Sequence, residues 1–252
     1  MLPIVYTPKG RAREYGELAL NLFEGCCARC RYCYVPAWRH ETREEWEATE
    51  VCERPDVLAR LANDLEKIKG QGKRIFLCFT CDPAPPDLRL IGWTIAAVKM
   101  IHDSGNFVTV LTKQLHVGLI RALIPGDLYG ASLTLHVSGD IEVWEPGTVD
   151  AGKRIFGLQV AHEAGIETFG SFEPVIDKGQ TLDLIEMAAP YLTTAKVGKS
   201  NHLGGWNWPS EAWEERVRGI DWAGFAEEVH TRCTTLGLDY YLKDDLRKEE
   251  RG

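Results

Sequence analysis

The sequence predicts an α/β fold, specifically a single (βα)6 partial TIM-like barrel with parallel strands. Segments typical of buried strands alternate with segments typical of helices about six times along the chain. This alternation indicates a parallel sheet whose strands are joined by right-handed helical crossovers. The chain has 252 residues and 44% hydrophobic content, so it can bury a large core. Six units are too few to close an eight-stranded barrel, and we therefore expect an open one.

The expected strands are short runs rich in apolar residues. They cover residues 18–24, 74–80, 107–113, 129–137, 166–175, 193–200 and 238–244. The expected helices have apolar residues at helical spacing or end at a glycine. They cover residues 54–69, 90–105, 116–124, 151–164, 181–192 and 222–237. Ligands bind such sheets at the carboxyl ends of the strands, so functional residues are expected just after each strand.

Residues 201–220 interrupt this alternation. The segment contains Trp206, Trp208 and Trp213 together with three glycines and one proline. We interpret it as a loop insertion at the barrel mouth that caps the barrel or faces the substrate. Alternatively, its tryptophans could anchor a surface loop, or stack on a base. The chain is expected to form one domain over residues 1–252, with its core at about 15–245.

The charge balance and the chain termini exclude some classes of protein. Lys and Arg total 29 against 37 Asp and Glu, a net charge of −8. This argues against broad, sequence-independent binding to nucleic acid, which needs a positive field. The first ten residues lack the layout of a signal peptide, and the longest apolar runs are too short to span a bilayer. We expect a soluble, cytoplasmic protein that does not bind membranes.

Half of the eight cysteines lie within residues 26–33, and such a tight cluster indicates a metal site. Cys26, Cys30 and Cys33 have the spacing C-x3-C-x2-C. Three thiolates can ligate three irons of a [4Fe–4S] cluster and leave the fourth iron open. An open iron can chelate S-adenosylmethionine (SAM), and one electron then cleaves SAM to give a 5′-deoxyadenosyl radical.

Other interpretations of the cysteines remain open. Zinc would take four ligands, which Cys30 and Cys33 could supply together with Cys78 and Cys81. Two residues that lie three apart on a strand point to opposite faces, so the second pair chelates poorly unless the strand ends between them. Cysteines of this cluster could also be structural. Cys27 is interpreted as a bystander, with an alternative ligand as the second interpretation.

Two further cysteines, Cys52 and Cys233, lie in segments expected to be helical, and we interpret them as core residues.

From the cysteine cluster onward the sequence resembles the radical SAM superfamily, and within it the spore photoproduct lyase-like branch. The resemblance covers most of the chain and rests on fragments in the family's order: EGCCARCRYCY, FTCDPAPPD, VLTKQ, ASLTLH, WEPGTVDAGKRI and HEAGIETFGSFEPVI. Two departures stand out. The family's Asn-Pro-Tyr-x-Gly is Asn-Leu-Phe-Glu-Gly at 21–25, and its His-Gly after the first cysteine is replaced at 27–29 by Cys-Ala-Arg.

The resemblance implies a SAM site built from residues that follow the strands. Lys113 is placed to meet the SAM carboxylate, while Thr80 and Asp82 lie where the SAM amino group is expected. Ser132 and Thr134 could bond the ribose or the methionine portion. For these polar residues, roles as a surface lysine, a turn cap or buried strand hydroxyls are the alternatives.

Arg154 could reach the SAM carboxylate or Glu145, and a helix-surface arginine is the alternative.

The substrate side is less defined. Cys78 and Cys81 are candidate hydrogen donors, with structural free cysteines as the alternative. Polar residues at the later strand ends could line the barrel mouth: His136, Glu173, Lys196, Lys199, Asn201 and His202. By analogy with the family, the substrate could be a nucleic-acid lesion, a nucleotide or a peptide, and a flavodoxin or ferredoxin is the expected electron donor. The rival hypotheses are a non-catalytic iron–sulfur or zinc-binding protein and a metal-free barrel enzyme.

Overall fold

A computed structural model describes residues 3–250, except for the side chains of Arg11 and of residues 248–250. At its centre is a sheet of eight strands in the order β1-β2-β5-β6-β7-β8-β9-β10. The strands are β1 (Val5–Tyr6), β2 (Leu18–Leu20), β5 (Arg74–Leu77), β6 (Phe107–Thr112), β7 (Leu128–Ser132), β8 (Glu167–Phe172), β9 (Thr194–Val197) and β10 (Asp239–Leu242). Strand β1 is antiparallel to β2, and every other pairing is parallel. The sheet is open, with β1 and β10 at its edges.

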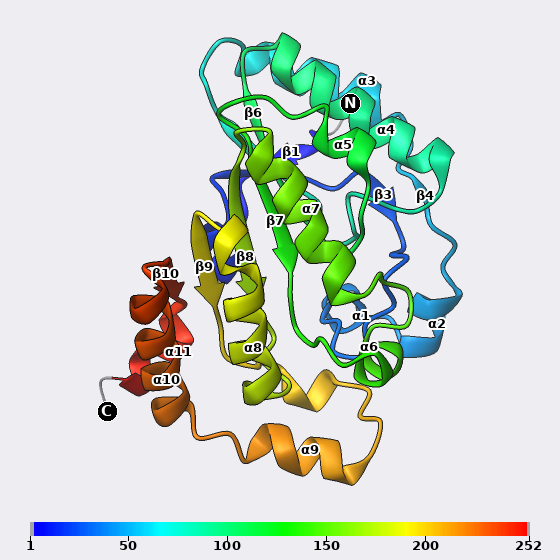
Figure 1. The fold of residues 1–252 in the computed structure, drawn as a ribbon. Helices are drawn as coiled ribbons and strands as arrows, with labels where there is room; N and C mark the ends of the chain where they lie inside the picture. Colours follow the sequence, from blue (N-terminus) through cyan, green and yellow to red (C-terminus); the bar gives the residue numbers. More distant parts are fainter. Residues whose placement is uncertain (1–2, 251–252) are drawn as a thin grey trace.

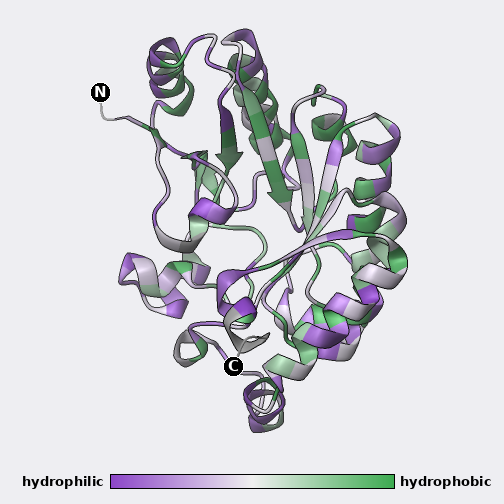
Figure 2. Cartoon of the chain, turned by 90° about the vertical axis from the view of Figure 1, so that its left-hand side faces the viewer, coloured by the Kyte–Doolittle hydropathy of each residue, from purple (hydrophilic) through white to green (hydrophobic). Residues whose placement is uncertain are grey.

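Helices cover the outer face of the sheet (Figure 1). They are α3 (Val57–Lys67), α4 (Leu88–Asp103), α5 (Val117–Ile120), α7 (Ala151–Glu163), α8 (Lys178–Ala188) and α10 (Trp222–Leu236). Asp side chains cap several of them: Asp87, Asp150, Asp177 and Asp221 each accept a bond from a backbone N–H in the first turn. Strands and the inward sides of these helices are the most hydrophobic parts of the chain, as Figure 2 shows.

Shorter elements gather at the carboxyl ends of the strands, the lower side of Figure 1. They include α1 (Val35–Arg39), α2 (Arg43–Ala48), α6 (Ser138–Trp144) and α9 (Glu211–Arg218). The short strands β3 (Phe23–Glu24) and β4 (Cys52–Glu53) lie higher in this view, beside α4. Helix α11 (Asp244–Glu250) follows β10, and 3-10 turns cover Gly10–Glu14, Ala189–Tyr191 and Leu203–Gly205. The site expected at this end is therefore covered by short helices and the loops between them.

The predicted alternation is confirmed, because each expected strand and helix overlaps an observed one. The count of six βα units is not confirmed, since the sheet has eight strands. Sequence periodicity could not reveal β1, which has two residues and exists through its pairing with β2. The interpretation of Cys52 was wrong: it lies exposed on β4, paired with β3, whereas Cys233 is buried in α10 as expected. Within residues 3–250, no helix combines the length and the apolar character needed to cross a membrane.

The tryptophans of residues 201–220 pack against Trp144, which is fully buried. The ring centroids of Trp206, Trp208 and Trp213 lie 5.6, 5.8 and 5.6 Å from that of Trp144. The backbone N–H of Asn207 also donates to the carbonyl oxygen of Arg31 at 2.9 Å. These aromatic contacts anchor the segment at the strand ends, beside the cysteine loop.

Candidate functional site

The cysteine loop follows β3, and one guanidinium holds its backbone. Arg43, the first residue of α2, donates to the carbonyl oxygens of Cys30, Arg31 and Cys33 at 3.0, 3.1 and 3.0 Å. Helix α2 itself starts at a capping box on Thr42, which fixes the position of Arg43. Three carbonyl oxygens thus converge on one planar donor, which gives the loop a defined shape.

The three thiols of the predicted cluster are near one another and withdrawn from solvent. Cys30 is buried, while Cys26 and Cys33 are half-buried. Burial, followed by the charge of Cys26, raises the pKa of Cys33 to about 11. Burial also raises the pKa of Cys30, although the nearby Lys113 ammonium acts against it. Because the thiolate is the ligand form, binding of iron here would release protons.

Cys27 belongs to the same hydrogen-bonded group. A hydrogen bond between the two thiols lowers the pKa of Cys26 and raises that of Cys27. The amide nitrogen of Gln114 lies 3.6 Å from the Cys27 sulfur and donates to the carbonyl oxygen of Gly147 at 2.6 Å. The loop after α6 thereby sits directly on the cysteine loop.

The three cysteines of the loop supply the kind of donor that an iron–sulfur cluster takes. Within residues 3–250, no three His, Cys, Asp or Glu side chains are grouped so that they could hold one metal ion. A [4Fe–4S] cubane does not need such a grouping, because each thiolate binds a different iron. The three soft thiol donors on one loop suit this group.

Lys113 lies at the end of β6 and points toward the cysteine loop. Its ammonium is 5.6 Å from the ring centroid of Tyr32. Burial acts to lower the pKa of Lys113, but the charges of Cys30 and Glu145 outweigh it, so the pKa is raised. Lys113 forms no ion pair within residues 3–250, and its ammonium is available to a bound anion.

Arg154 and Glu145 form a fully buried ion pair with an N–O distance of 2.6 Å. The second Glu145 oxygen accepts bonds from the hydroxyls of Tyr32 and Thr134, the latter at 2.6 Å. Arg154 also donates to the carbonyl oxygen of Ser132 at 2.9 Å. The partners expected for Arg154 were the SAM carboxylate or Glu145, and the structure shows the ion pair with Glu145.

The remaining guanidinium contacts of Arg154 are to the Val149 carbonyl oxygen and the Thr148 hydroxyl. Its side chain therefore organises the loop beside the site.

Asp82 links the ends of β5 and β6. Its carboxylate accepts bonds from the Thr112 hydroxyl at 2.6 Å, the Lys113 N–H at 2.8 Å and the Ala84 N–H at 2.9 Å. Thr80 lies two residues earlier, and its hydroxyl is buried without a hydrogen-bond partner in the part of the chain that is described. Buried hydroxyls usually have a hydrogen-bond partner, and a bound ligand could supply one to Thr80.

Cys78 and Cys81 face each other. Strand β5 ends at Leu77, and Cys78 has a φ of +69°. The Cys78 thiol is close enough to Cys81 to raise the pKa of that thiol. Both are buried, and burial raises the pKa of Cys81 well above its usual value. The expectation that they point to opposite faces does not apply, because the strand ends before both residues.

Other predicted mouth residues do not join the cysteine group. His136 contacts Asp183 at 3.2 Å, and Asn201 contacts Asp245 at 2.6 Å. Lys199 lies over the Trp222 ring, and His202 is exposed. Glu173 forms an ion pair with Lys243, and Lys196 donates to the Glu14 carbonyl oxygen.

Sequence analysis missed several residues of the site. They are Tyr32, Arg43, Gln114, Trp144 and Gly147. Tyr32, between two cysteines, and Gly147, in the turn after Glu145, carried the clearest sequence signals.

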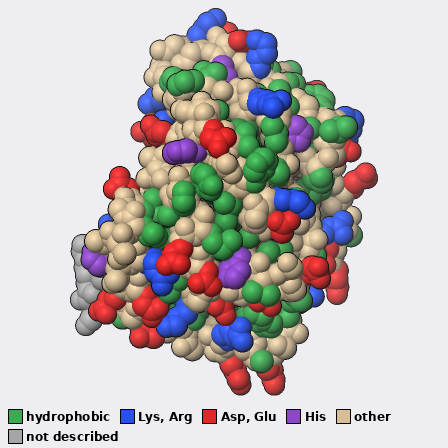
Figure 3. Space-filling model, viewed as in Figure 1, with side chains coloured by type: hydrophobic (Ala, Val, Ile, Leu, Met, Phe, Trp, Pro, Cys, Tyr) green, Lys and Arg blue, Asp and Glu red, His purple; other side chains and the backbone are tan. Residues whose placement is uncertain are grey.

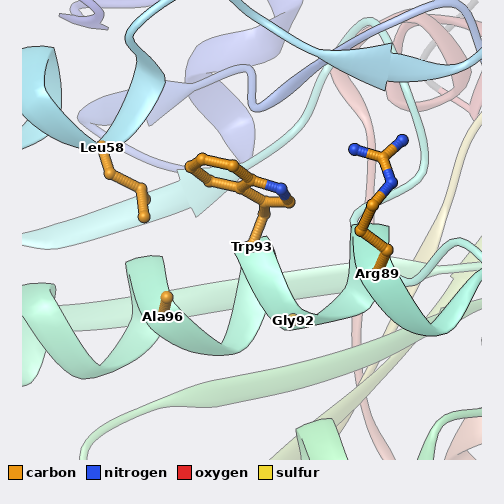
Figure 4. A pocket seen from close by; sticks show the side chains of 5 residues that line it. All are labelled: Leu58, Arg89, Gly92, Trp93 and Ala96. Atoms are coloured by element: carbon orange, nitrogen blue, oxygen red, sulfur yellow. The ribbon is translucent and has the colours of Figure 1, made fainter.

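Two hollows are candidate binding sites. One, of about 550 Å³, borders the cysteine loop and is lined by Cys27, Arg29, Arg31, Glu47, Val51, Pro146, Gly147 and Asn207. The other, of about 210 Å³, is a shallow groove between α3 and α4 (Figure 4), lined by Leu58, Arg89, Gly92, Trp93 and Ala96. The groove contains neither a thiol nor a carboxylate, so the first hollow is the one relevant to the candidate site.

The buried Glu145 makes folding stability pH-dependent. Burial acts to raise its pKa, but Arg154, Lys113 and two hydroxyl donors outweigh burial and lower it. A carboxyl whose folded pKa lies below its unfolded value of about 4.3 contributes stability above that value, and loses it as the pH falls through the folded pKa. We expect urea midpoints to fall steeply below about pH 4. The Glu145→Gln/Arg154→Met double variant should show a shallower acid limb, and equal limbs would contradict this assignment.

Comparison with known proteins identifies the fold. No family model matches the sequence, and no curated protein matches it. Spore photoproduct lyase, in a variant with bound AdoMet and dinucleoside spore photoproduct, superposes with a TM-score of 0.68 at 13% identity, over 95% of this chain and 79% of that chain. The chain has the fold of spore photoproduct lyase. The resemblance expected from the sequence is thus confirmed for the architecture.

Two further structures agree with this result. Spore photoproduct lyase complexed with dinucleoside spore photoproduct gives a TM-score of 0.66 at 14% identity, over 94% of this chain and 79% of that chain. SuiB of Streptococcus suis bound to S-adenosylmethionine gives 0.64 at 12% identity, over 89% of this chain and 49% of that chain. At such identities the likeness concerns the fold alone.

Proposed function

We propose that this chain is a single-domain radical SAM enzyme. The observation that carries the proposal is the loop of Cys26, Cys30 and Cys33 at the strand ends of a fold shared with proteins that bind SAM. Cys26, Cys30 and Cys33 would hold a [4Fe–4S] cluster. When bound there, the cluster and SAM supply one-electron cleavage of SAM and hydrogen abstraction from a substrate.

The residues around the loop have complementary roles in this proposal. The unpaired Lys113 ammonium would bind the SAM carboxylate, and the unpartnered Thr80 hydroxyl would bond a polar group of SAM. Ser132 ends β7 and Thr134 follows it, and in this proposal they would bond the ribose or the methionine portion of SAM. Asp82 would act by fixing the positions of Lys113 and the β5 turn.

Arg154 would support the SAM site indirectly, by holding Glu145 beside Lys113 and Tyr32. Cys78 or Cys81 would return a hydrogen atom to the substrate radical, and the pKa of Cys81 responds to the charge of Cys26.

The substrate and the reductant are also part of the proposal. The similar structures carry a dinucleoside lesion in one case and a precursor peptide in another. On the face seen in Figure 3, basic and acidic side chains are intermixed, so that face offers no continuous positive surface for a nucleic-acid backbone. We favour a nucleotide-sized substrate, and a flavodoxin or ferredoxin as the electron donor in a cytoplasmic setting.

The test is anaerobic reconstitution with iron and sulfide, followed by dithionite and SAM, with 5′-deoxyadenosine measured by chromatography. We expect an absorption band at about 400 nm and formation of 5′-deoxyadenosine. Cys30→Ala should abolish both, while Cys52→Ala, an exposed cysteine on β4, is the matched control and should leave both unchanged. A colourless, zinc-loaded protein that forms no 5′-deoxyadenosine would instead support a structural metal site.

A further inference from the structure

A second polar group lies on the inner face of the sheet, away from the cysteine loop. It consists of Tyr15, Ser171, Glu173, Lys196 and Lys243, which we call the inner-wall group. Tyr15 precedes β2, Ser171 lies in β8 and Lys196 in β9, while Glu173 and Lys243 directly follow β8 and β10. The SAM site proposed above uses none of these residues.

Strand register places this group beside the proposed SAM site. Ser132 in β7 pairs with Ser171 in β8, which pairs with Lys196 in β9. Residues paired in a parallel sheet project to the same face, and neighbouring strands are about 4.8 Å apart. Lys196 is therefore about 10 Å across the sheet from Ser132, close enough for one small molecule to contact both regions.

Lys243 is already neutralised within the inner-wall group. Its ammonium forms ion pairs with Glu173 and, at 3.5 Å, with Glu14, and it lies 4.2 Å from the Tyr15 ring centroid. The Tyr15 hydroxyl is 2.7 Å from the Ser171 hydroxyl and 3.4 Å from Glu173. These contacts tie the N-terminal segment to the last strand of the sheet.

Lys196 differs from Lys243 because it forms no ion pair within residues 3–250. Its ammonium lies 4.9 Å from the ring centroids of both Tyr15 and Phe169, and it donates to the Glu14 carbonyl oxygen at 3.3 Å. The side chain is half-buried, and burial together with the charge of Lys243 lowers its pKa. The charge of Glu14 acts against these two causes, but Lys196 has no ion pair of its own among residues 3–250. A partly desolvated ammonium without such a partner is unfavourable, and an anion bound there would offset its desolvation.

We propose that Lys196, with the Ser171 and Tyr15 hydroxyls, binds a carboxylate or phosphate group of the substrate. The inference rests on the proposed function, because it assigns the substrate side of the same barrel. It adds that the substrate is an anion. Lys196 supplies the charge, and the Ser171 hydroxyl can donate to the anion while it accepts from the Tyr15 hydroxyl, which orients it.

The test measures the reactivity of Lys196 in the reconstituted protein with SAM present. Lysines are labelled with a neutral acetylating reagent, and the rate at each lysine is read by peptide mass spectrometry. Methyl phosphate and propionate are added separately at constant ionic strength. We expect one of them to slow acetylation of Lys196 at least fivefold and saturably, and its identity separates phosphate from carboxylate. Lys153, a surface lysine paired with Asp150 at 3.0 Å, is the internal control and should not respond.

A Ser171→Ala variant makes the test specific. It removes one donor and leaves Lys196 in place, so the protection should weaken severalfold. If neither probe slows Lys196 more than Lys153, Lys196 only braces Tyr15 and Phe169, and the inference is overturned. Protection of Lys196 without 5′-deoxyadenosine formation would overturn the radical SAM proposal alone, so the two failures are distinguishable.

Discussion

Replacing Arg154 by Met is expected to lower the free energy of unfolding by about 3–5 kcal/mol. The substitution leaves the fully buried Glu145 carboxylate without its ion pair, and it removes the bond to the Ser132 carbonyl oxygen. An uncompensated buried charge costs far more than the pair contributes when intact. Urea denaturation followed by tryptophan fluorescence would measure the change.

Two controls separate the buried charge from general disruption. Glu145→Gln in the Arg154→Met background removes the charge, and should recover most of the loss. Lys153→Met changes the neighbouring helix position, which is exposed, and should shift stability by less than about 0.5 kcal/mol. A double variant no more stable than Arg154→Met would show that lost packing, and not charge, is the cause.

Gly147→Ala is expected to disrupt the cysteine loop. A Cβ at this position would lie 1.8 Å from the carbonyl oxygen of Cys27, which is far inside any permitted contact. Because the neighbour is backbone, the loop itself must shift, and with it Cys26 and Cys30. We expect at least a tenfold loss of iron and sulfide incorporated on reconstitution, measured by colorimetric assay, and about 3 kcal/mol lower stability.

Gly92→Ala is the matched control. Gly92 lies in the exposed part of α4, and a Cβ there meets no atom within 4 Å. Alanine in a helix interior should stabilise the protein by about 0.5–1 kcal/mol and leave iron incorporation unchanged. Normal iron content in Gly147→Ala would mean that the contact with Cys27 does not position the ligand loop.

The sequence predicted elements whose formation depends on local pattern. Apolar runs such as 107–113 and periodic segments such as 151–164 formed the expected strand and helix, because burial on one or two faces determines both. That Cys26, Cys30 and Cys33 lie on one loop could be predicted from their spacing alone, and their role as cluster ligands stays a prediction. Residues that follow a strand, such as Lys113, could be placed at the correct end of the sheet.

Features that depend on pairing between distant segments could not be predicted. Strand β1 and the exposed Cys52 owe their positions to partners on other strands. The inner-wall group joins Tyr15 to Lys243, more than two hundred residues away, and no local pattern signals such a contact. Cys78 and Cys81 are close together as free thiols after the end of β5, where Cys78 has a positive φ angle.

The bonds from Arg43 have a consequence for how the protein could gain and lose iron. In small zinc domains the metal is needed for folding, so removing it unfolds the chain. Here Arg43 donates to three carbonyl oxygens of the cysteine loop. Its fourth bond, at 3.4 Å, goes to the carbonyl oxygen of Gly205 in the segment 201–220. Much of the conformational entropy of the loop is therefore lost during folding and not during metal binding. For the cluster proposed here, this predicts that the protein keeps its shape when the cluster is lost, and that it can be reloaded with iron without unfolding.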